Sequence, residues 1–480
     1  MALSAVQYPY RPNRSAVSDW GFVCLVQRMS YIDTTMFHDN ERDPTMSVQT
    51  AQLTDRLTRT QAARCSAMAE ALIGSEILKI ASEIRALVAE GKIICNLTVG
   101  DFSPAEFRIP RFLEENIIDA LQRGETSYPP SDGMLVLKKS ILAFYERWLQ
   151  LRFRLESVLV TGGSRPGIYG TYRALVDPGD VVVYPVPSWN NNHYCHLVEA
   201  RGVAVQCSSD ELFLPTRSRL ERAVRGARLL ALNSPLNPTG TAFTREALEG
   251  ICDLVLEENA RRSREERPLY LLYDQVYWML TFGSTHHYDP LTLRPALASY
   301  TILVDGISKP FSATGVRVGW VIGPSDVVHH MASIIGHVGA WAPRAEQVAV
   351  AKLLSATDEI KAYHRAMKGG VQQRLERLYD AMSFMRSEGL PVDVIPPMGA
   401  LYLSVRFALN GKHTASGTLL ATNEDIRTFL LHEAGLAAVP FQAFGVNDES
   451  GWFRLSVGAV SLEELEQMVP RLKDALHTLQ

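Results

Sequence analysis

The chain is 480 residues long, 46% of its residues are hydrophobic and 21% are charged, and its formal net charge is −4. This balance is typical of a globular protein with two or three domains, and it gives no general attraction to nucleic acid or to an anionic membrane. No apolar run is long enough to predict a membrane span. The six cysteines are scattered without a CxxC pair, which favours free thiols in the reducing cytoplasm.

The N-terminal region divides into two expected segments. Residues 1–60 are mostly polar, with several prolines and arginines, and we expect an extension without fixed structure. A transit peptide is one alternative, because the segment begins with a stretch that lacks acids, and translation from Met46 is another. Residues 61–99 are expected to pack with a small C-terminal domain. Within them, apolar residues recur at helical spacing between Gly74 and Gly91, which predicts a helix there.

The rest of the chain predicts an α/β fold with a large and a small domain. Residues 100–343 alternate apolar strands with helices, which indicates a mainly parallel sheet covered by helices on both faces. Residues 344–480 are expected to form an interdomain helix and a smaller α+β domain. The helical pattern extends to about residue 387 and has a weak point at Gly369–Gly370.

A glycine-rich turn follows the first strand of the large domain. Gly163, Ser164 and Arg165 lie where this strand ends and a helix begins, so free backbone N–H groups are expected to face an anion. The spacing is neither GxGxxG nor GxxxxGK[ST], so it does not support a dinucleotide or nucleoside triphosphate site. The turn alone is weak evidence for any particular anion.

Two further strands end in residues suited to holding a flat ring. Trp189 follows the strand that begins at Val181, and its indole either packs in the core or stacks on a ligand. Asn237 stands in the rigid turn Asn233-Ser-Pro-Leu-Asn-Pro-Thr-Gly240, which follows another strand. A rigid amide in this place could donate to a ring oxygen, whereas a plain structural turn is the alternative.

Asp274 ends the next predicted strand. α/β sheets bind their ligands at the carboxyl ends of parallel strands, so this carboxylate lies where a ligand is expected. Next to a pyridine nitrogen it would keep that nitrogen protonated, and Tyr277 could hydrogen-bond a ring hydroxyl. For Asp274 alone, a cap on the following helix is an equally good explanation.

Lys309 provides the most informative feature. It follows the apolar run that begins at Tyr300, and burial there favours the neutral, nucleophilic form of its amine. Arg317 comes eight residues later and has a planar guanidinium suited to a phosphate. An amine together with a phosphate clamp is what pyridoxal phosphate requires.

In order and spacing, these segments resemble the fold-type I pyridoxal-phosphate enzymes, specifically the class I/II aminotransferase (aspartate aminotransferase-like) family. The resemblance covers roughly residues 70–475. It implies that Lys309 bonds covalently to pyridoxal 5′-phosphate and that Asp274 pairs with the pyridine nitrogen. It also implies that Tyr277 and Asn237 contact the ring hydroxyl and that Trp189 stacks on the ring.

The resemblance also assigns the remaining site residues. The phosphate would be held by Gly163, Ser164, Arg165 and Arg317. Tyr128, in Ser127-Tyr128-Pro, matches the tyrosine that the family sends into the neighbouring subunit's phosphate site, which implies a homodimer. Arg454, in Phe453-Arg454-Leu-Ser456, matches the arginine that binds the substrate α-carboxylate, and Gly100 matches the glycine that approaches this carboxylate.

Three positions depart from the family pattern. Gly306 stands where a phosphate-binding Ser or Thr is usual, so Ser308 or Arg165 would have to compensate. Ser234 stands where an asparagine is more common. Some members that act on acidic substrates have a Lys at the position of Arg165, which makes an acidic substrate one interpretation, with a role toward phosphate or solvent as the other.

The predicted activity is transamination between an L-amino acid and a 2-oxo acid by a ping-pong mechanism, with Lys309, Asp274 and Tyr277 as catalytic residues. A lyase, of the carbon–sulfur or aminocyclopropane-carboxylate synthase kind, is the first alternative, because it needs the same carbanion. A non-catalytic pyridoxal-phosphate-binding regulator is the second. The identity of the amino acid stays open. No nucleic-acid or membrane partner is expected from the net charge and the lack of a long apolar run. No metal is expected either, because the paired histidines lack carboxylates or cysteines at ligand spacing.

Overall fold

The computed structural model describes residues 65–72 and 76–480. The chain divides into two units, Met1–Ser66 and Ala67–Gln480, and the account below concerns the second. The extension expected for residues 1–60, and the possible start at Met46, lie outside the described residues.

The large domain is built on a seven-stranded sheet with strand order β2-β8-β7-β6-β5-β3-β4. All neighbouring strands are parallel except β8, which runs antiparallel to β2 and to β7. The mainly parallel sheet predicted from the alternation of apolar runs is therefore confirmed. In chain order the strands are β2 (Val158–Thr161), β3 (Val181–Val186), β4 (Arg201–Gln206), β5 (Leu229–Asn233), β6 (Tyr270–Asp274), β7 (Thr301–Gly306) and β8 (Gly319–Ile322).

Helices cover both faces of this sheet, because its central strands are apolar on both sides. In β6, Leu271 and Tyr273 enter one core, and Tyr270 and Leu272 enter the core on the opposite face. The first core includes residues of α5 (Leu135–Leu149), α8 (Arg217–Glu221), α9 (Arg245–Arg261) and α12 (Arg344–Ser355). The second includes residues of α6 (Ser164–Leu175), α7 (Asn191–Leu197) and α11 (Ser325–Val338). The layers place the carboxyl ends of the parallel strands along one edge, where ligands are expected.

The small domain is an antiparallel sheet of order β12-β13-β10-β9. Its strands are β9 (Val392–Val394), β10 (Tyr402–Phe407), β12 (Val439–Pro440) and β13 (Trp452–Ser456), and α14 (Asn423–Glu433) and α15 (Leu462–His477) pack with them. Near the start of the described chain, α3 (Glu76–Ala89) forms at the predicted place, and β1 (Cys95–Asn96) pairs in parallel with β11 (Leu436–Ala437). Short helices are α2 (Ala67–Glu70), α10 (Pro290–Leu293) and the 3-10 turns at Leu155–Ser157, Ser209–Glu211, Pro295–Ser299, Thr314–Val316 and Phe441–Phe444.

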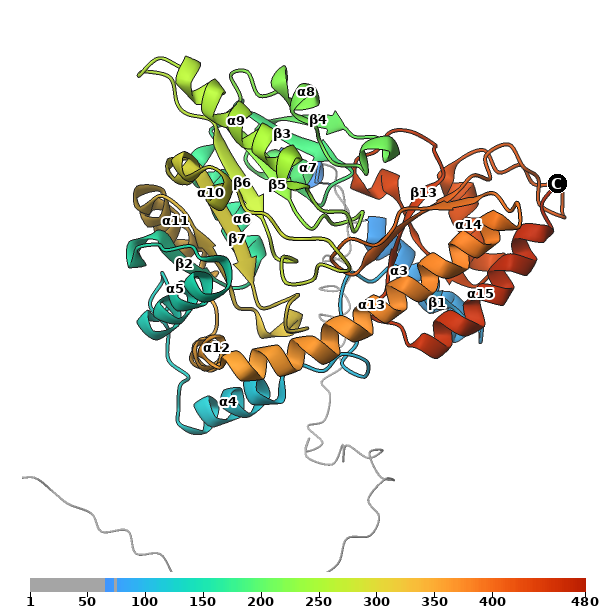
Figure 1. Ribbon diagram of the computed structural model, residues 1–480, viewed down its shortest axis with the longest axis horizontal. Coiled ribbons are helices and arrows are strands. Elements are labelled where there is room, and N and C mark those ends of the chain that lie inside the picture. Colours follow the sequence, from blue (N-terminus) through green and yellow to red (C-terminus); the bar gives the residue numbers. More distant parts are fainter. Residues whose placement is uncertain (1–64, 73–75) are drawn as a thin grey trace, which may run out of the picture. The chain divides into compact units, whose positions relative to one another are not determined.

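A long helix connects the two domains, and its boundaries differ from the prediction. Figure 1 shows α13 (Thr357–Ser387) running from the helices α4 (Arg111–Gln122) and α12 toward the small domain. The helical stretch breaks at Ala356, with φ −91° and ψ 75°, and not at Gly369–Gly370. Each glycine costs a helix only about 1 kcal/mol. Gly370 also allows close packing, because a Cβ there would lie 3.1 Å from the Phe107 ring.

The described residues contain no helix that is both long and apolar enough to cross a membrane. Four cysteines, Cys95, Cys195, Cys207 and Cys252, are buried as thiols, and burial raises the pKa of each to about 12. They are therefore protonated and unreactive at neutral pH.

The end of β7 explains why residue 306 is a glycine. Gly306 lies opposite Gly319 of the antiparallel strand β8. A Cβ at residue 306 would lie 2.9 Å from the Gly319 Cα and 3.0 Å from the Val318 carbonyl oxygen. Because these are backbone atoms, they cannot move aside at low cost. The Ser or Thr that is usual in the family does not fit between these two strands.

We predict that Gly306→Ala lowers the free energy of unfolding of the cofactor-free protein by about 1 to 3 kcal/mol, because the added methyl group overpacks the β7–β8 contact. Urea unfolding followed by circular dichroism measures the change. Gly315→Ala is the matched control, since nothing lies within 4 Å of a Cβ at that position. Equal stability of the two variants would contradict the explanation.

Candidate active site

Lys309 lies just beyond the end of β7 and faces the loop that contains Gly100. Its Nζ donates a hydrogen bond to the Gly100 carbonyl oxygen at 2.7 Å and lies 5.9 Å from the centre of the Tyr277 ring. Burial lowers the pKa of this amine to about 8, nearby Asp101 opposes the shift, and the arginines of the site add to it. A lowered pKa increases the neutral fraction of the amine, which is the form that attacks a carbonyl.

Asp274 ends β6 and has no cationic side chain bonded to it in the described part of the chain. Its Oδ1 accepts a hydrogen bond from the Val276 N–H at 3.2 Å. Burial raises the pKa of this carboxyl to about 7, while the Val276 N–H and Lys309 act in the opposite direction. A carboxylate with so little compensation is suited to a cationic ring nitrogen, which would stabilise its charge.

The glycine-rich turn forms an anion-binding cradle at the start of α6. Gly163 is the N-cap, with φ 87°, and no side chain caps the helix, so its first N–H groups are available. A side chain at residue 163 would overlap the guanidinium of Arg317. Arg317 donates to the carbonyl oxygens of Gly162 at 2.9 Å and Thr314 at 2.7 Å. The helix terminus and a fixed cation therefore face the same space.

Arg165 contributes a second cation next to this cradle. Its guanidinium carbon lies 5.3 Å from the centre of the Trp189 ring. Burial, and then the charge of Arg165, lowers the pKa of Arg317, which shows that the two guanidiniums are close. Neither forms an ion pair with an acid in the described residues. The charge of Asp101 partly offsets the lowered pKa of Arg317, but neither guanidinium is bonded to an acid in the described structure, so the two like charges favour a bound anion.

Arg454 lies in the middle of the small-domain sheet and is 1% exposed. Its Nη1 donates to Asn237 Oδ1 at 3.1 Å, and its Nη2 donates to the Thr98 carbonyl oxygen at 2.6 Å. Its Nε is buried without a partner. Burial lowers the pKa of this guanidinium. The unsatisfied donor and the absence of an acidic partner in the described residues fit the binding of a carboxylate.

Tyr277 and Gly100 lie near Lys309 and, through Tyr402, beside Arg454. The Tyr277 hydroxyl lies 2.7 Å from the Tyr402 hydroxyl, and burial raises the pKa of both phenols. A Cβ on Gly100 would lie 3.0 Å from the Tyr402 hydroxyl and 3.5 Å from Arg454 Nη1. A glycine at this position leaves room for a ligand beside the guanidinium.

The structure brings most of the predicted site residues into one region. Contacts or electrostatic interactions connect Lys309, Asp274, Tyr277, Asn237, Gly100, Arg454, Gly163, Arg165, Arg317 and Trp189, with Ser164 next to Gly163 at the start of α6. Tyr128 is the exception. It is 84% exposed and packs edge-on against Trp341, with ring centres 5.7 Å apart.

The arrangement fits pyridoxal phosphate. The cradle at α6 and Arg317 could hold its phosphate, Asp274 its ring nitrogen, and Asn237, Tyr277 or both its ring hydroxyl. Ser308, the residue before Lys309, is 9% exposed, and its role as a substitute for the hydroxyl missing at Gly306 stays a prediction. No group of three or more potential metal ligands occurs in the described residues.

Sequence reasoning missed two groups around the site. Tyr402 contacts Tyr277, and its ring centre lies 4.8 Å from the guanidinium carbon of Arg454. Asp305 accepts hydrogen bonds from Tyr145 and from Trp278, both at 2.9 Å, behind the Lys309 segment. A signal for Asp305 was present, since it is an acid at the end of an apolar strand, as Asp274 is. No local signal marks Tyr402.

Comparisons with known proteins agree with this geometry. The family described as Aminotransferase class I and II matches residues 92–472. The aspartate aminotransferase of Rhizobium meliloti (strain 1021) is 31% identical over 409 residues, which cover 84% of this chain and 94% of that protein. The aspartate aminotransferase of Bacillus sp. (strain YM-2) is 27% identical over 406 residues, covering 84% and 96%.

Solved structures give the same result. The crystal structure of the Rhizobium meliloti aspartate aminotransferase aligns with a TM-score of 0.79 and 28% identity, covering 87% of this chain and all of that one. The Thermus thermophilus aspartate aminotransferase with maleate aligns with a TM-score of 0.75 and 25% identity, covering 86% and 99%.

The fold and the site thus define a pyridoxal-phosphate enzyme of fold type I. The chain belongs to the class I and II aminotransferase family. It is an aminotransferase that moves an amino group between an L-amino acid and a 2-oxo acid in two half-reactions at one site. The predicted family, fold class and activity are confirmed, whereas the roles of individual residues and the domain boundaries stay predictions.

We predict that Asp274→Asn makes the cofactor-free protein more stable at pH 8 by roughly 1 to 3 kcal/mol. The carboxyl has a pKa of about 7 in the folded protein and 3.8 as its ordinary value, so the folded state binds more protons between these values. Protonation of Asp274 therefore favours the folded state at low pH, and this stabilisation is lost as the pH rises through about 7. The difference between variant and wild type should shrink at pH 5.

Thermal and urea unfolding across pH 5 to 8 measure this effect. Asp380→Asn, which removes an exposed acid on α13, is the control and should show no such pH dependence. A stability difference for Asp274→Asn that stays constant with pH would contradict the burial argument.

Proposed function

We propose that this aminotransferase acts on a dicarboxylic L-amino acid, with L-aspartate as the foremost candidate, and that pyridoxal phosphate is bound through Lys309. The observation that carries the proposal is a pair of guanidiniums without acidic partners, Arg454 and Arg165. After the larger effects of burial and of Asp101, the charges of Arg454, Arg165 and Arg317 each lower the pKa of Lys309, and Arg454 lies beside Gly100, whose carbonyl oxygen accepts a hydrogen bond from the Lys309 amine. A substrate with two carboxylates would neutralise one guanidinium on each side of the reacting carbon.

Arg165 is the better candidate for the distal carboxylate, and Arg317 for the phosphate. The Arg317 guanidinium is held by hydrogen bonds to two carbonyl oxygens and lies next to Gly163. Arg165 has no hydrogen-bond partner in the described residues and lies over Trp189, so its guanidinium is free to meet a substrate. The relatives named aspartate aminotransferase support an acidic substrate for this chain.

The chemistry follows from the environment of each residue. When bound, pyridoxal phosphate supplies an aldehyde carbon that receives the amino group and a ring that accepts the electron pair left on the α carbon. Lys309, once its amine is free, removes the proton from the substrate α carbon, and its pKa of about 8 leaves a useful neutral fraction at neutral pH. Asp274 would keep the ring nitrogen protonated, and its own charge would thereby be compensated.

Arg454 orients the substrate for this proton transfer. Its guanidinium is held by Asn237 and the Thr98 carbonyl, so a carboxylate bound to it is fixed relative to Lys309. The rings of Tyr402 and Phe444 lie 4.8 Å and 4.9 Å from its guanidinium carbon and keep water from it. Exclusion of water strengthens the interaction of the two charges.

A homodimer is part of the proposal. Tyr128 is 84% exposed and packs against Trp341, whose backbone lies next to Gly162 of the glycine-rich turn, so its hydroxyl is accessible to a second copy of the chain. A second copy could receive its hydroxyl at the phosphate, as the family resemblance implies. Analytical ultracentrifugation that finds only monomers at micromolar concentration would exclude this role. The relatives named aspartate aminotransferase favour transamination over the lyase alternative. We also expect the protein to be located in the cytoplasm.

We predict that Arg165→Met lowers kcat/KM for L-aspartate by about 100-fold and leaves kcat/KM for L-phenylalanine within about threefold, because only aspartate loses a charged partner. Steady-state kinetics with both amino acids measure the change. The affinity for pyridoxal phosphate should change little, because Arg317 and the start of α6 remain.

Arg173→Met is the control, since Arg173 is exposed on the same helix and has no ion pair in the described residues. A large loss of cofactor affinity with a uniform loss of activity would instead assign Arg165 to the phosphate.

A further inference from the structure

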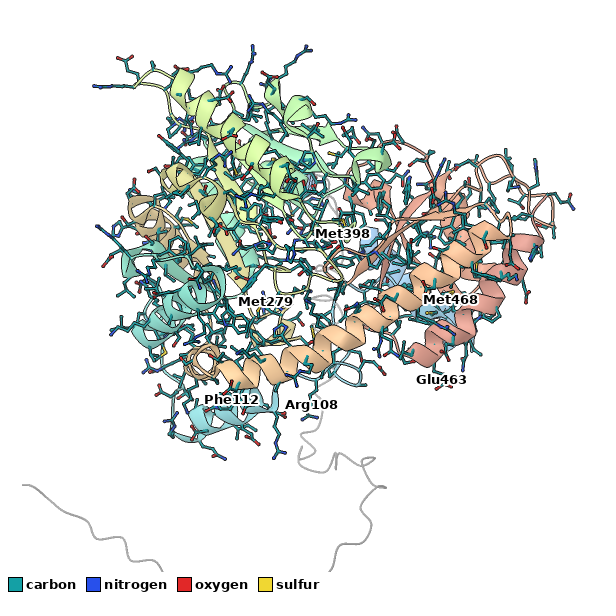
Figure 2. The ribbon with its side chains drawn as sticks, viewed as in Figure 1. Arg108, Phe112, Met279, Met398, Glu463 and Met468 are labelled. Atoms are coloured by element: carbon teal, nitrogen blue, oxygen red, sulfur yellow. The ribbon has the colours of Figure 1, made fainter. Side chains whose placement is uncertain are left out.

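A cavity lies between the large domain and α13. It is bounded by residues 148–149 at the end of α5, residues 278–287 and residues 361–368 of α13, and we call it the α13 cavity. Met279, labelled in Figure 2, belongs to its large-domain wall. Its volume of about 540 Å³ lies within the range of small-molecule sites.

One wall of the α13 cavity is basic. Lys361, His364, Arg365 and Lys368 are spaced so that they lie on one face of α13, and all four line the cavity. No Asp or Glu is among the lining residues. The ion pairs of α13 in the described structure involve three arginines further along the helix, so the lysines and the arginine of this wall have no acidic partner there.

The opposite wall is aromatic and contains polar atoms without partners. Trp148 and Trp278 line it together with Leu149 and Met279. On this wall, the Trp148 Nε1 and both ring nitrogens of His287 are buried without a hydrogen-bond partner in the described chain, and so is the Nε2 of His364 on the α13 wall. Such groups are rare in folded proteins, because each has lost its water without compensation.

The two histidines, which are half-buried, are neutral at physiological pH. Burial lowers the pKa of His287 to about 3 and, with a smaller contribution from Lys368, lowers the pKa of His364 to about 4. Each imidazole therefore has one N–H donor and one acceptor nitrogen. The positive charge of the cavity comes from Lys361, Arg365 and Lys368.

We propose that the α13 cavity binds a small organic anion with an aromatic or other flat apolar body. The three cations would bind its carboxylate, phosphate or sulfonate group, and the indoles would pack against its body. An inorganic ion would leave the aromatic wall uncovered, and a neutral aromatic compound would leave the cations unpaired. The combination of both walls therefore selects the class of ligand.

The cavity is separate from the substrate site, but its walls contact residues beside Lys309. The Trp278 Nε1 donates to Asp305 Oδ2 at 2.9 Å, and Asp305 ends the strand that leads to Lys309. The His364 ring packs edge-on against Phe311, with centres 5.3 Å apart, and Phe311 is two residues after Lys309. A ligand in the α13 cavity would therefore touch Trp278 and His364, which in turn contact residues on either side of Lys309.

The test uses 8-anilinonaphthalene-1-sulfonate, which combines a sulfonate with aromatic rings and fluoresces when it leaves water. Titration of the holoenzyme should show one saturable site, and saturating L-aspartate should not displace the probe. Lys361→Gln combined with Arg365→Gln should weaken binding about tenfold or more, because two of the three cations are lost. Met279→Trp should weaken it similarly by filling the cavity without changing the charge.

Lys139→Gln combined with Arg222→Gln is the matched control, since both residues are exposed and neither lines the cavity. It should bind the probe like the wild type, and thermal unfolding of all variants checks that they are folded. Equal affinity of the Lys361/Arg365 variant and this control would overturn the proposal. So would displacement of the probe by L-aspartate, or binding that never saturates.

Discussion

The structure depends on keeping several ionisable groups away from water around one lysine. Burial lowers the pKa of Lys309 to about 8 and raises the pKa of Asp274 to about 7, and Arg454 is buried without an acidic partner in the described residues. Each of these groups costs stability in the cofactor-free protein. Each is also suited to one part of a cofactor or substrate that carries the complementary charge. The fold therefore maintains an arrangement that becomes favourable when its ligands bind.

Rigid elements hold this arrangement. Asp274 ends β6, Lys309 lies just beyond the end of the adjacent parallel strand β7, and Arg454 lies on β13, between β10 and β12 of the small domain. Behind Lys309, the buried Asp305 is bonded to Tyr145 and Trp278, and burial raises the pKa of its carboxyl to about 7. These two hydrogen bonds hold the end of β7 in place, and this fixes where the segment that contains Lys309 begins.

Much of this could be predicted from the sequence, because strand ends are marked locally. Apolar runs followed by Asp274 or Lys309 identify both the strand and the residue that meets a ligand, and family-like spacing connects them. Contacts between distant segments carry no such mark. Tyr402 of the small domain meets Tyr277, which follows β6, although the two are far apart in sequence. The helical stretch breaks at Ala356, while Gly369 and Gly370 lie inside the continuous helix α13. Gly306 departs from the family pattern, and the sequence does not explain why. The structure does, because a Cβ at this position would collide with its strand partner, Gly319.

The central claim is that Lys309 and two separate guanidiniums make this protein an aminotransferase for acidic substrates. The most direct measurement follows the visible absorbance of the purified holoenzyme during a single half-reaction. Added L-aspartate should remove the visible band of the bound cofactor, 2-oxoglutarate should restore it, and L-phenylalanine at the same concentration should act far more weakly. Lys309→Ala should show no such cycle. A cycle that persists in Lys309→Ala, or a wild-type band that does not respond to L-aspartate, would contradict the account.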